Sequence, residues 1–333
     1  MGYVGHDLQR PECILAERDG TLWSADARGG VVRISPDGDQ SIVTEHWSDR
    51  FESAATDGSR YLQGTLPNGL AFVRTGDFLI SNFGTDRLEM MSRDGRSTVL
   101  ADEIDGQPIG KVNFVLRDSL DRIWITVSTR KTNWMDALRT DLADGYLARY
   151  DRGGVHVIAD GFRFTNEIRF DANEEFLYVV ETTGGCITRL RIDRDGRATD
   201  REIFGPTTLG PGAWPDGIAF DSYGNLWGTL VYSDKLFVLT PEGDLRILLD
   251  EGDPLRVGAL EDAFIQNRVT EDVLFATGRG LAPWMASVTF GGPDLQTVYI
   301  GSLKGSCIPY FRAPVAGLPM VHWNECVATL PKR

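Results

Sequence analysis

Residues 215–230 read PDGIAFDSYGNLWGTL. Two short apolar runs, 218–220 and 226–230, are joined by the polar turn 221–225. Apolar runs joined by a turn rich in Gly, Asn and Asp are typical of a β-hairpin. The unusual feature is Asp216, an acidic residue at the start of an otherwise apolar strand. Asp216 is either a turn former or one member of a set, and the rest of the chain distinguishes the two.

The pattern recurs along the chain. Each copy is a short strand, a polar turn and a second strand with an aromatic or large apolar residue. The other copies are PECILAERDGTLWSAD from Pro11, PNGLAFVRTGDFLISN from Pro67, KVNFVLRDSLDRIWITV from Lys111, FTNEIRFDANEEFLYVVET from Phe164 and ASVTFGGPDLQTVYIGS from Ala286, the last having drifted. A further hairpin signal follows most copies: SPDGDQ from Ser35, SRDGRS from Ser92, DRDGRA from Asp193 and TPEGDL from Thr240.

These repeats predict an all-β fold. Their spacing is close to the roughly 40 to 50 residues of a four-stranded propeller blade. We therefore predict one six-bladed β-propeller domain over residues 1–333, with innermost strands that start near residues 12, 68, 113, 166, 216 and 286. A two-sheet sandwich is the alternative, but it gives no reason for a six-fold recurrence.

Three segments interrupt the repeat: 46–64, 129–144 and 253–283. The third has apolar residues at roughly helical spacing, which predicts a short helical insertion. Long insertions in a compact fold are usually lids, binding loops or interfaces.

Composition narrows the function and the compartment. The chain has 34 Lys and Arg against 48 Asp and Glu, a net charge of −14, which disfavours nucleic acid and anionic membranes as partners. It has no apolar run long enough to span a membrane and no secretory signal at its N-terminus. No two of its four cysteines form a CxxC pair, which favours a reduced, cytoplasmic protein; they are Cys13, Cys186, Cys307 and Cys326.

Aligned in the propeller, the residues at the start of the six innermost strands form a ring around the axis: Glu12, Asn68, Asn113, Asn166, Asp216 and Ala286. Five of the six carry a carboxylate or amide oxygen. Asn68-Gly69 also fits a turn, whereas Glu12 is no turn former. Charges at such a place are costly unless paired or bound to a metal. The ring therefore predicts one hard divalent cation, with Ca²⁺ favoured and Mg²⁺, Mn²⁺ and Zn²⁺ as alternatives.

Together the motifs PEC…DGTLW, KVNF, FTNE…LY, PDGIAFD…GNLW and FGGPDLQTVY resemble the senescence marker protein, gluconolactonase and luciferin-regenerating-enzyme family, over about residues 10 to 323. The resemblance implies a six-bladed propeller with one divalent cation in the central channel. It implies Glu12, Asn166 and Asp216 as the metal ligands, with Asn113 beside the metal and the substrate.

The chain departs from the family around this site. Regucalcin-like members have an Arg two residues before the Asn of blade three and Asp-Gly after it, where this chain has Lys111 and Phe114-Val115. The usual Asn-Gly of blade four is Asn166-Glu167 here. We expect an intact metal site, but the substrate pocket need not be that of the sugar lactonases.

The expected function is metal-dependent hydrolysis of a small cyclic ester by a gluconolactonase-like lactonase. The cation would polarise the lactone carbonyl, and Asp216 would take a proton from the attacking water. Asn113 and Lys111 would stabilise the developing oxyanion. Arg130 and Trp134, on the insertion 129–144, are expected to contact substrate, because binding residues concentrate on such loops.

Other functions stay open at this point. The same scaffold also suits an organophosphate or other ester hydrolase. A non-enzymatic propeller that binds a divalent cation or a small molecule is the alternative from another class. The sequence does not indicate which lactone is the substrate, which cation is native or how many copies of the chain assemble.

Overall fold

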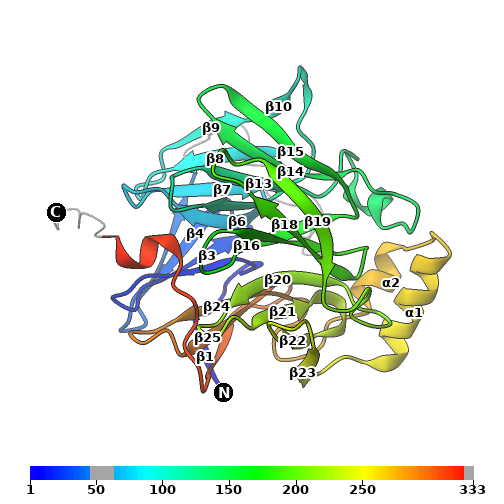
Figure 1. The fold of residues 1–333 in the computed structure, drawn as a ribbon. Coiled ribbons are helices and arrows are strands. Elements are labelled where there is room, and N and C mark those ends of the chain that lie inside the picture. Colours follow the sequence, from blue (N-terminus) through cyan, green and yellow to red (C-terminus); the bar gives the residue numbers. More distant parts are fainter. Residues whose placement is uncertain (46–63, 326–333) are drawn as a thin grey trace.

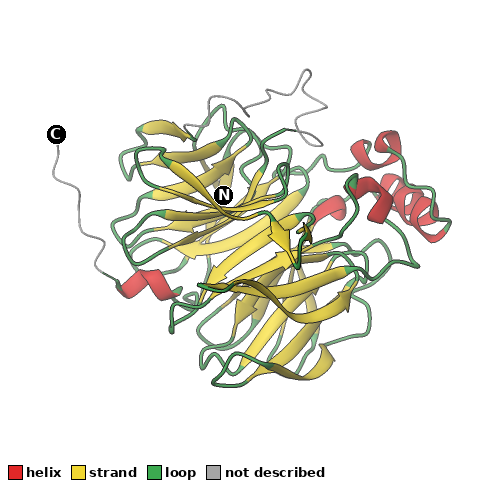
Figure 2. Cartoon of the chain, turned by 90° about the horizontal axis from the view of Figure 1, so that it is seen from above, coloured by secondary structure: helices red, strands yellow, loops and turns green. Residues whose placement is uncertain are grey.

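A computed structural model describes residues 1–45 and 64–325, and these form six four-stranded antiparallel sheets around a common axis (Figures 1 and 2). The predicted six-bladed β-propeller is confirmed. Blade one comprises β2 (Ile14–Ala16), β3 (Leu22–Asp26), β4 (Gly30–Ile34) and β5 (Gln40–Thr44). Blade two comprises β6 (Pro67–Phe72), β7 (Phe78–Asn82), β8 (Arg87–Met91) and β9 (Ser97–Ala101). Blade three comprises β12 (Val112–Arg117), β13 (Ile123–Val127), β14 (Gly145–Asp151) and β15 (Gly154–Phe162).

Blades four and five continue the pattern. Blade four comprises β16 (Thr165–Phe170), β17 (Phe176–Glu181), β18 (Cys186–Ile192) and β19 (Ala198–Phe204). Blade five comprises β20 (Pro215–Phe220), β21 (Leu226–Leu230), β22 (Lys235–Leu239) and β23 (Leu245–Asp250). The first strand of each blade contacts the first strands of its neighbours, so these strands line the axis.

Blade six closes the ring with strands from both ends of the chain. It comprises β24 (Met285–Gly291), β25 (Thr297–Ser302), β26 (Ile308–Arg312) and, outermost, β1 (Gly2–Val4). Strand β1 runs antiparallel to β26, with Gly2 opposite Tyr310 and Val4 opposite Ile308. The repeat pattern does not reveal this closure, because β1 lies outside every copy of the motif.

The repeated turns have a specific chemistry. In three blades a carboxylate in the first hairpin turn accepts a hydrogen bond from the indole N–H of the Trp six residues later. The pairs are Glu17 with Trp23 at 2.6 Å, Asp118 with Trp124 at 2.8 Å and Asp221 with Trp227 at 3.0 Å. The acidic residue and the Trp of the sequence motif are thus two ends of one contact, which fixes the turn against the second strand.

The cores lie between neighbouring blades. One cluster of buried apolar side chains joins blades one to four and includes Phe72, Phe114 and Leu177. Another packs blade one against blades five and six and includes Ile14 and Val288. The sheets therefore hold each other around the axis, and the ring positions lie in a rigid setting.

Two of the predicted insertions carry helices. Residues 129–144 separate β13 from β14 and contain the short 3-10 helix η2 (Trp134–Ala137). Residues 253–283 separate β23 from β24 and contain α1 (Pro254–Ile265), which Asp253 caps, and α2 (Glu271–Phe275), which Thr270 caps. The third, 46–64, lies outside the described residues except for Gly64. A two-stranded hairpin, β10 (Glu103–Ile104) with β11 (Gln107–Pro108), follows blade two.

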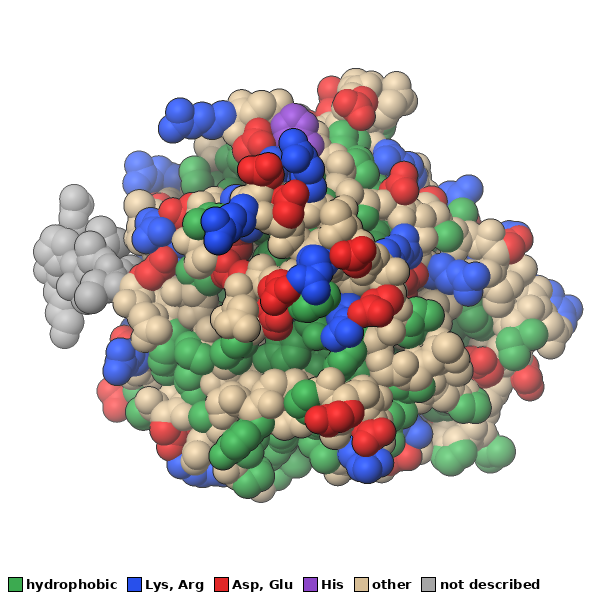
Figure 3. All heavy atoms as spheres, in the orientation of Figure 1, with side chains coloured by type: hydrophobic (Ala, Val, Ile, Leu, Met, Phe, Trp, Pro, Cys, Tyr) green, Lys and Arg blue, Asp and Glu red, His purple; other side chains and the backbone are tan. Residues whose placement is uncertain are grey.

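The helices lie at opposite sides of the propeller. Helices α1 and α2 lie on one side, whereas η4 (Val321–Asn324) lies on the other (Figures 1 and 2). A further 3-10 turn, η3 (Val231–Ser233), follows β21. Acidic and basic side chains are interspersed on the face shown in Figure 3. Within the described ranges, no helix combines the length and apolar character needed to cross a membrane.

Candidate functional site

The ring residues meet at the start of the innermost strands. In five blades the ring residue is the second residue of the strand, and Glu12 lies two residues before β2. In those five blades the pairing with the next strand shifts register just there, as between Pro67 and Leu70 and between Pro215 and Ile218. Such bulges redirect a side chain out of the regular alternation. This explains how polar side chains can point to the axis from strands that are otherwise apolar.

The structure brings the five oxygen-bearing ring residues into one cavity. Its lining includes Glu12, Asn68, Asn113, Asn166 and Asp216, and their exposed fractions are only 2 to 5%. The sequence therefore predicted correctly which polar residues lie together. Ala286 occupies the sixth position at the start of β24 and is not part of the lining.

Their hydrogen bonds divide the five residues into two groups. Asn68 donates from Nδ2 to the backbone O of Asn113 at 3.0 Å and to its Oδ1 at 3.2 Å. By contrast, Asn166 donates from Nδ2 to Thr182 Oγ1 at 3.1 Å, and its buried Oδ1 accepts nothing in the described part of the chain. The buried Oε2 of Glu12 also accepts no hydrogen bond there. The ring oxygens that accept no hydrogen bond in the described chain are thus Glu12 Oε2, which Arg10 approaches as an ion pair, and Asn166 Oδ1.

Arg10 is a site residue that the sequence analysis missed. Its buried guanidinium lines the cavity, with Nη1 2.8 Å from Glu12 Oε2 and Nη2 donating to Asn68 Oδ1 at 2.6 Å. Arg10 has a left-handed backbone, with φ of 56°, which is uncommon for a residue with a Cβ. No signal in the repeat pattern identifies it, because it precedes the ring position by two residues.

The cavity has an excess of buried negative charge. Burial raises the pKa of Glu12 to about 7, although Arg10 opposes the shift. Burial, and then the charges of Glu12 and Glu167, hold the pKa of Asp216 well above its ordinary value. Glu167 takes the place of the family's Gly; burial raises its pKa to about 7, against the effect of Arg169. Three carboxylates thus lie near one another beside two guanidinium groups.

These features fit a hard cation. Buried carboxylate and amide oxygens that lack partners are the donors such ions take. The described residues contain no group of three or more His, Cys, Asp or Glu side chains arranged to hold a metal. The ring supplies a mixed set instead, two carboxylates and one amide oxygen.

Seven further lining residues have aromatic or aliphatic side chains, with the Tyr232 hydroxyl as a polar group among them. They are Phe83, Trp134, Phe164, Val231, Tyr232, Trp284 and Leu303. We call these seven residues the aromatic cover. Trp134, from η2, lies edge-on between Phe83 and Phe164, with ring centroids 6.2 and 6.3 Å away. The placement of Trp134 agrees with the prediction that the insertion 129–144 reaches the site.

Lys111 and Arg130 lie elsewhere. Lys111 is buried, and its Nζ lies 2.8 Å from Asp86 Oδ1. Arg130 is exposed, and its guanidinium stacks 4.5 Å from the centre of the Tyr146 ring. Neither lines the cavity. Substrate contact by either residue stays a prediction, now without support from their positions.

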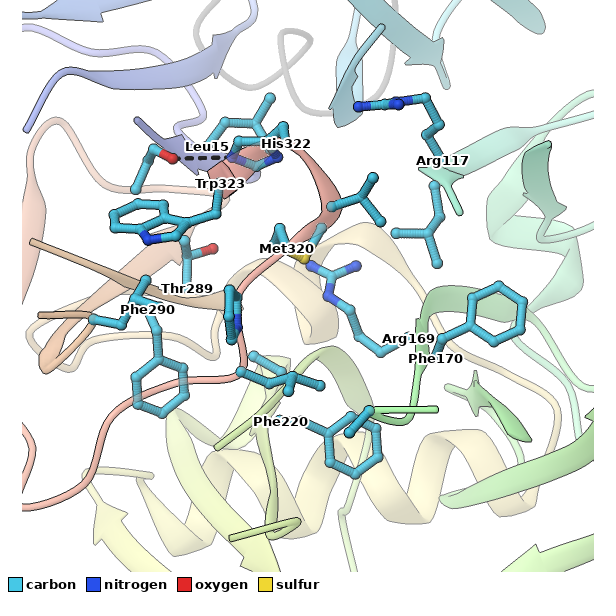
Figure 4. Close-up of a pocket in the computed structure, with 18 of the residues that line it drawn as sticks. Leu15, Arg117, Arg169, Phe170, Phe220, Thr289, Phe290, Met320, His322 and Trp323 are labelled. Atoms are coloured by element: carbon cyan, nitrogen blue, oxygen red, sulfur yellow. Dashed lines mark hydrogen bonds between the residues drawn. The ribbon is translucent and has the colours of Figure 1, made fainter. Parts of the chain in front are cut away.

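A second cavity, of about 130 Å³, lies among the innermost strands beneath the segment that carries η4 (Figure 4). Its walls are mostly apolar and include Phe220, Phe290 and Met320, and no ring oxygen reaches it. Arg169 extends into it toward Met320, while its Nη2 lies 3.0 Å from Glu167 Oε2. Arg169 thus lines the second cavity, whereas its ion-pair partner Glu167 lines neither.

Fold and site together define a class: a six-bladed propeller with an axial cavity lined by ring oxygens and an aromatic cover. Residues 10–250 match the family model described as the SMP-30/Gluconolactonase/LRE-like region. The chain therefore belongs to the SMP-30/gluconolactonase/LRE-like family, and the resemblance found in its motifs is confirmed.

Individual relatives are more distant. The chain is 26% identical over 165 residues to 6-deoxy-6-sulfogluconolactonase of Pseudomonas putida, covering 49% of this chain and 47% of that protein. It is 29% identical over 168 residues to pentonolactonase XacC of Haloferax volcanii, covering 50% and 47%. The chain thus spans about half the length of the curated relatives it matches. The structure of regucalcin from Agrobacterium tumefaciens, described as a calcium-binding protein, matches with a TM-score of 0.64 at 16% identity, covering 95% of each chain. That likeness shows the fold.

Proposed function

We propose that this protein is a lactonase that hydrolyses a small cyclic ester and depends on a divalent cation held by Glu12, Asn166 and Asp216. The observation that carries the proposal is that two buried oxygens, Glu12 Oε2 and Asn166 Oδ1, accept no hydrogen bond in the described chain and line one cavity together with the buried carboxylate of Asp216. The names of the two curated relatives support a lactone as the substrate. The regucalcin likeness makes Ca²⁺ the first cation to test.

A bound cation would supply Lewis-acid polarisation of the ester carbonyl and acidify a water molecule. Asp216 is the proton acceptor we propose for the attacking water. It lines the cavity and has no ion-pair partner among the described residues, whereas Arg10 is engaged with Glu12. A carboxylate at that position can accept the proton without breaking an existing ion pair.

Asn113 is the proposed donor to the developing oxyanion. Its Oδ1 accepts a hydrogen bond from Asn68, so its Nδ2 group is the end left to donate into the cavity. Asn68 is in turn held by Arg10 at 2.6 Å. This chain of contacts fixes the amide before substrate binds, and such preorganisation is what makes an oxyanion donor effective.

The test is turnover by the whole chain, stripped with chelator and reloaded with Ca²⁺, Mg²⁺, Mn²⁺ or Zn²⁺, across a panel of lactones and esters. Acid release in a pH-stat is the readout. We expect the protein to hydrolyse at least one lactone. Chelator should abolish this hydrolysis, and one of these cations should restore it. Glu12→Gln should lose it, whereas Asp37→Asn, on an exposed turn, should not. A protein that binds the cation but hydrolyses nothing would instead be a binding propeller.

A further inference from the structure

We infer that the ligand of this site is a compact lactone with an apolar or aromatic ring system, not a polyhydroxylated sugar acid lactone, and that Trp134 binds an oxygen of its ester group through the indole N–H. The inference rests on the proposed function for the ester group. It adds the class of molecule attached to that ester and the residue that recognises it.

The first argument is the composition of the cavity lining. Among its polar residues, Arg10 binds Glu12 and Asn68, Asn68 binds Asn113, and the remaining oxygens are those proposed to hold the cation. The aromatic cover adds mostly hydrocarbon surface, apart from the hydroxyl of Tyr232 and the indole N–H groups. A ligand in this cavity has its ester against the ring oxygens and the rest of its body against aromatic rings.

A sugar acid lactone does not match that cover. Its ring carries several hydroxyls, and each one buried without a partner weakens binding by roughly tenfold or more. An apolar ring of the same size leaves no group unpaired and gains by leaving water. The cover therefore discriminates against hydroxylated rings as a class.

The second argument is the indole N–H of Trp134, which has no hydrogen-bond acceptor among the described residues. The cover contains two tryptophans, and Trp284 donates from Nε1 to Thr277 Oγ1 at 2.9 Å. Trp134 is only 8% exposed, lines the cavity, and its Nε1 is buried without a partner among the described residues. An indole N–H only donates, so it calls for an acceptor atom on the ligand, which in a lactone with an apolar ring is an ester oxygen.

Trp134 is also held rigidly, so its indole N–H favours one position of the ligand's acceptor atom. Phe83 and Phe164 flank it at interplanar angles of 67° and 66°, an edge-to-face arrangement that favours one ring orientation. Asn133 caps η2 by accepting from Met135 N at 3.2 Å. The donor is thus fixed in place before the ligand arrives.

Binding of uncleavable amide analogues tests the inference apart from catalysis. Dihydroquinolinone, an aromatic bicyclic lactam, and gluconolactam are titrated calorimetrically into the whole protein with each cation present. We expect dihydroquinolinone to bind at least about tenfold more tightly. Trp134→Phe keeps an aromatic ring but removes the donor, and should weaken that binding roughly five- to tenfold.

Trp323→Phe is the matched control, since Trp323 is equally buried but lines the second cavity. It should leave both affinities unchanged. Equal or tighter binding of gluconolactam overturns the inference, as does unchanged affinity in folded Trp134→Phe. If Trp134→Phe does not fold, the relative affinity of the wild-type protein for the two lactams still tests the inferred ligand class. Hydrolysis of dihydrocoumarin and of gluconolactone is measured alongside. If neither lactone is hydrolysed but dihydroquinolinone still binds selectively, only the proposed lactonase activity is refuted. If gluconolactone is hydrolysed in preference to dihydrocoumarin, only the inferred ligand class is refuted.

Discussion

Replacing Asp216 by Asn should change the stability of the protein in opposite directions with and without the cation. The structure places three buried carboxylates, Glu12, Glu167 and Asp216, beside two buried guanidiniums. Arg10 pairs with Glu12 and Arg169 pairs with Glu167, so in the described chain Asp216 is the carboxylate left without an ion pair.

The magnitude follows from that arrangement. In chelator, Asp216→Asn removes an unpaired buried charge, and we expect the free energy of unfolding to rise by about 1 to 3 kcal/mol. With saturating cation the variant loses one of two carboxylate donors. Each tenfold loss of cation affinity removes about 1.4 kcal/mol of the stabilisation that the cation provides. The amide keeps one oxygen donor, so we expect weaker but measurable binding.

Thermal unfolding with chelator and with a cation series measures both effects. For a chain of this length, about 1 kcal/mol corresponds to a shift in Tm of roughly 1.4 °C. Turnover at saturating cation should fall by about 10² or more, the scale for losing a positioned base. Asp118→Asn is the contrast, because buried Asp118 accepts from Trp124 and pairs with Arg122, and its loss should destabilise in both conditions.

Two results would refute this reasoning. If Asp216→Asn is less stable than wild type in chelator, Asp216 is already satisfied in the metal-free protein. If the cation-induced shift in Tm equals that of wild type, Asp216 is no ligand. Near wild-type turnover at full occupancy would remove Asp216 as the base while leaving it as a possible ligand.

Three further predictions concern other parts of the molecule. Burial, and then the charge of Glu89, raises the pKa of Glu45 from 4.5 to about 9. Between these values the folded chain holds a proton that the unfolded chain releases, so the free energy of unfolding should fall with rising pH by up to about 1.4 kcal/mol per unit. Denaturant titrations across that range should show a smaller slope for Glu45→Gln, and an equal slope would contradict the assignment. Arg130→Ala should leave the order of lactone preference unchanged, whereas Trp134→Ala should alter it. The measurement is kcat/KM across the lactone panel. A changed order in Arg130→Ala would indicate that Arg130 contacts the substrate after all. Deleting β1 (Gly2–Val4) should lower the free energy of unfolding by about 2 to 4 kcal/mol, because it removes ladder hydrogen bonds worth about 1 kcal/mol each. An unchanged denaturation midpoint would mean that the pairing of β1 with β26 contributes little to stability.

Much of the fold was predictable because its signals are local. Turn residues recur at blade spacing, and three of the copies contain the carboxylate and Trp that fix their own hairpin, as Asp221 and Trp227 do. The ring oxygens follow from that alignment, since each occupies the same register. The alignment therefore placed the five oxygen-bearing residues in one cavity without any long-range information, whereas the choice of Glu12, Asn166 and Asp216 as ligands came from the family resemblance and stays a prediction.

The rest depends on contacts that no local pattern encodes. Arg10 reaches Asn68 of the next blade through a left-handed backbone. Lys111 was expected at the oxyanion because of its place before Asn113, but it pairs with Asp86, which belongs to the connection between β7 and β8. These arrangements are set by packing between blades, where sequence spacing gives no direction for a side chain.

The pairing of β1 with β26 has a consequence for how this protein folds. During synthesis β1 emerges before the blades, but its partner β26 follows roughly 300 residues later. For that interval blade six does not exist, and the apolar edge of blade one that packs on it stays open. Contacts so distant in sequence form slowly, because a long loop must close before they stabilise anything. The last step of folding is then the pairing of β1 with β26. Until this step occurs, the propeller is an open arc with exposed blade edges, and these edges are where aggregation is most favoured.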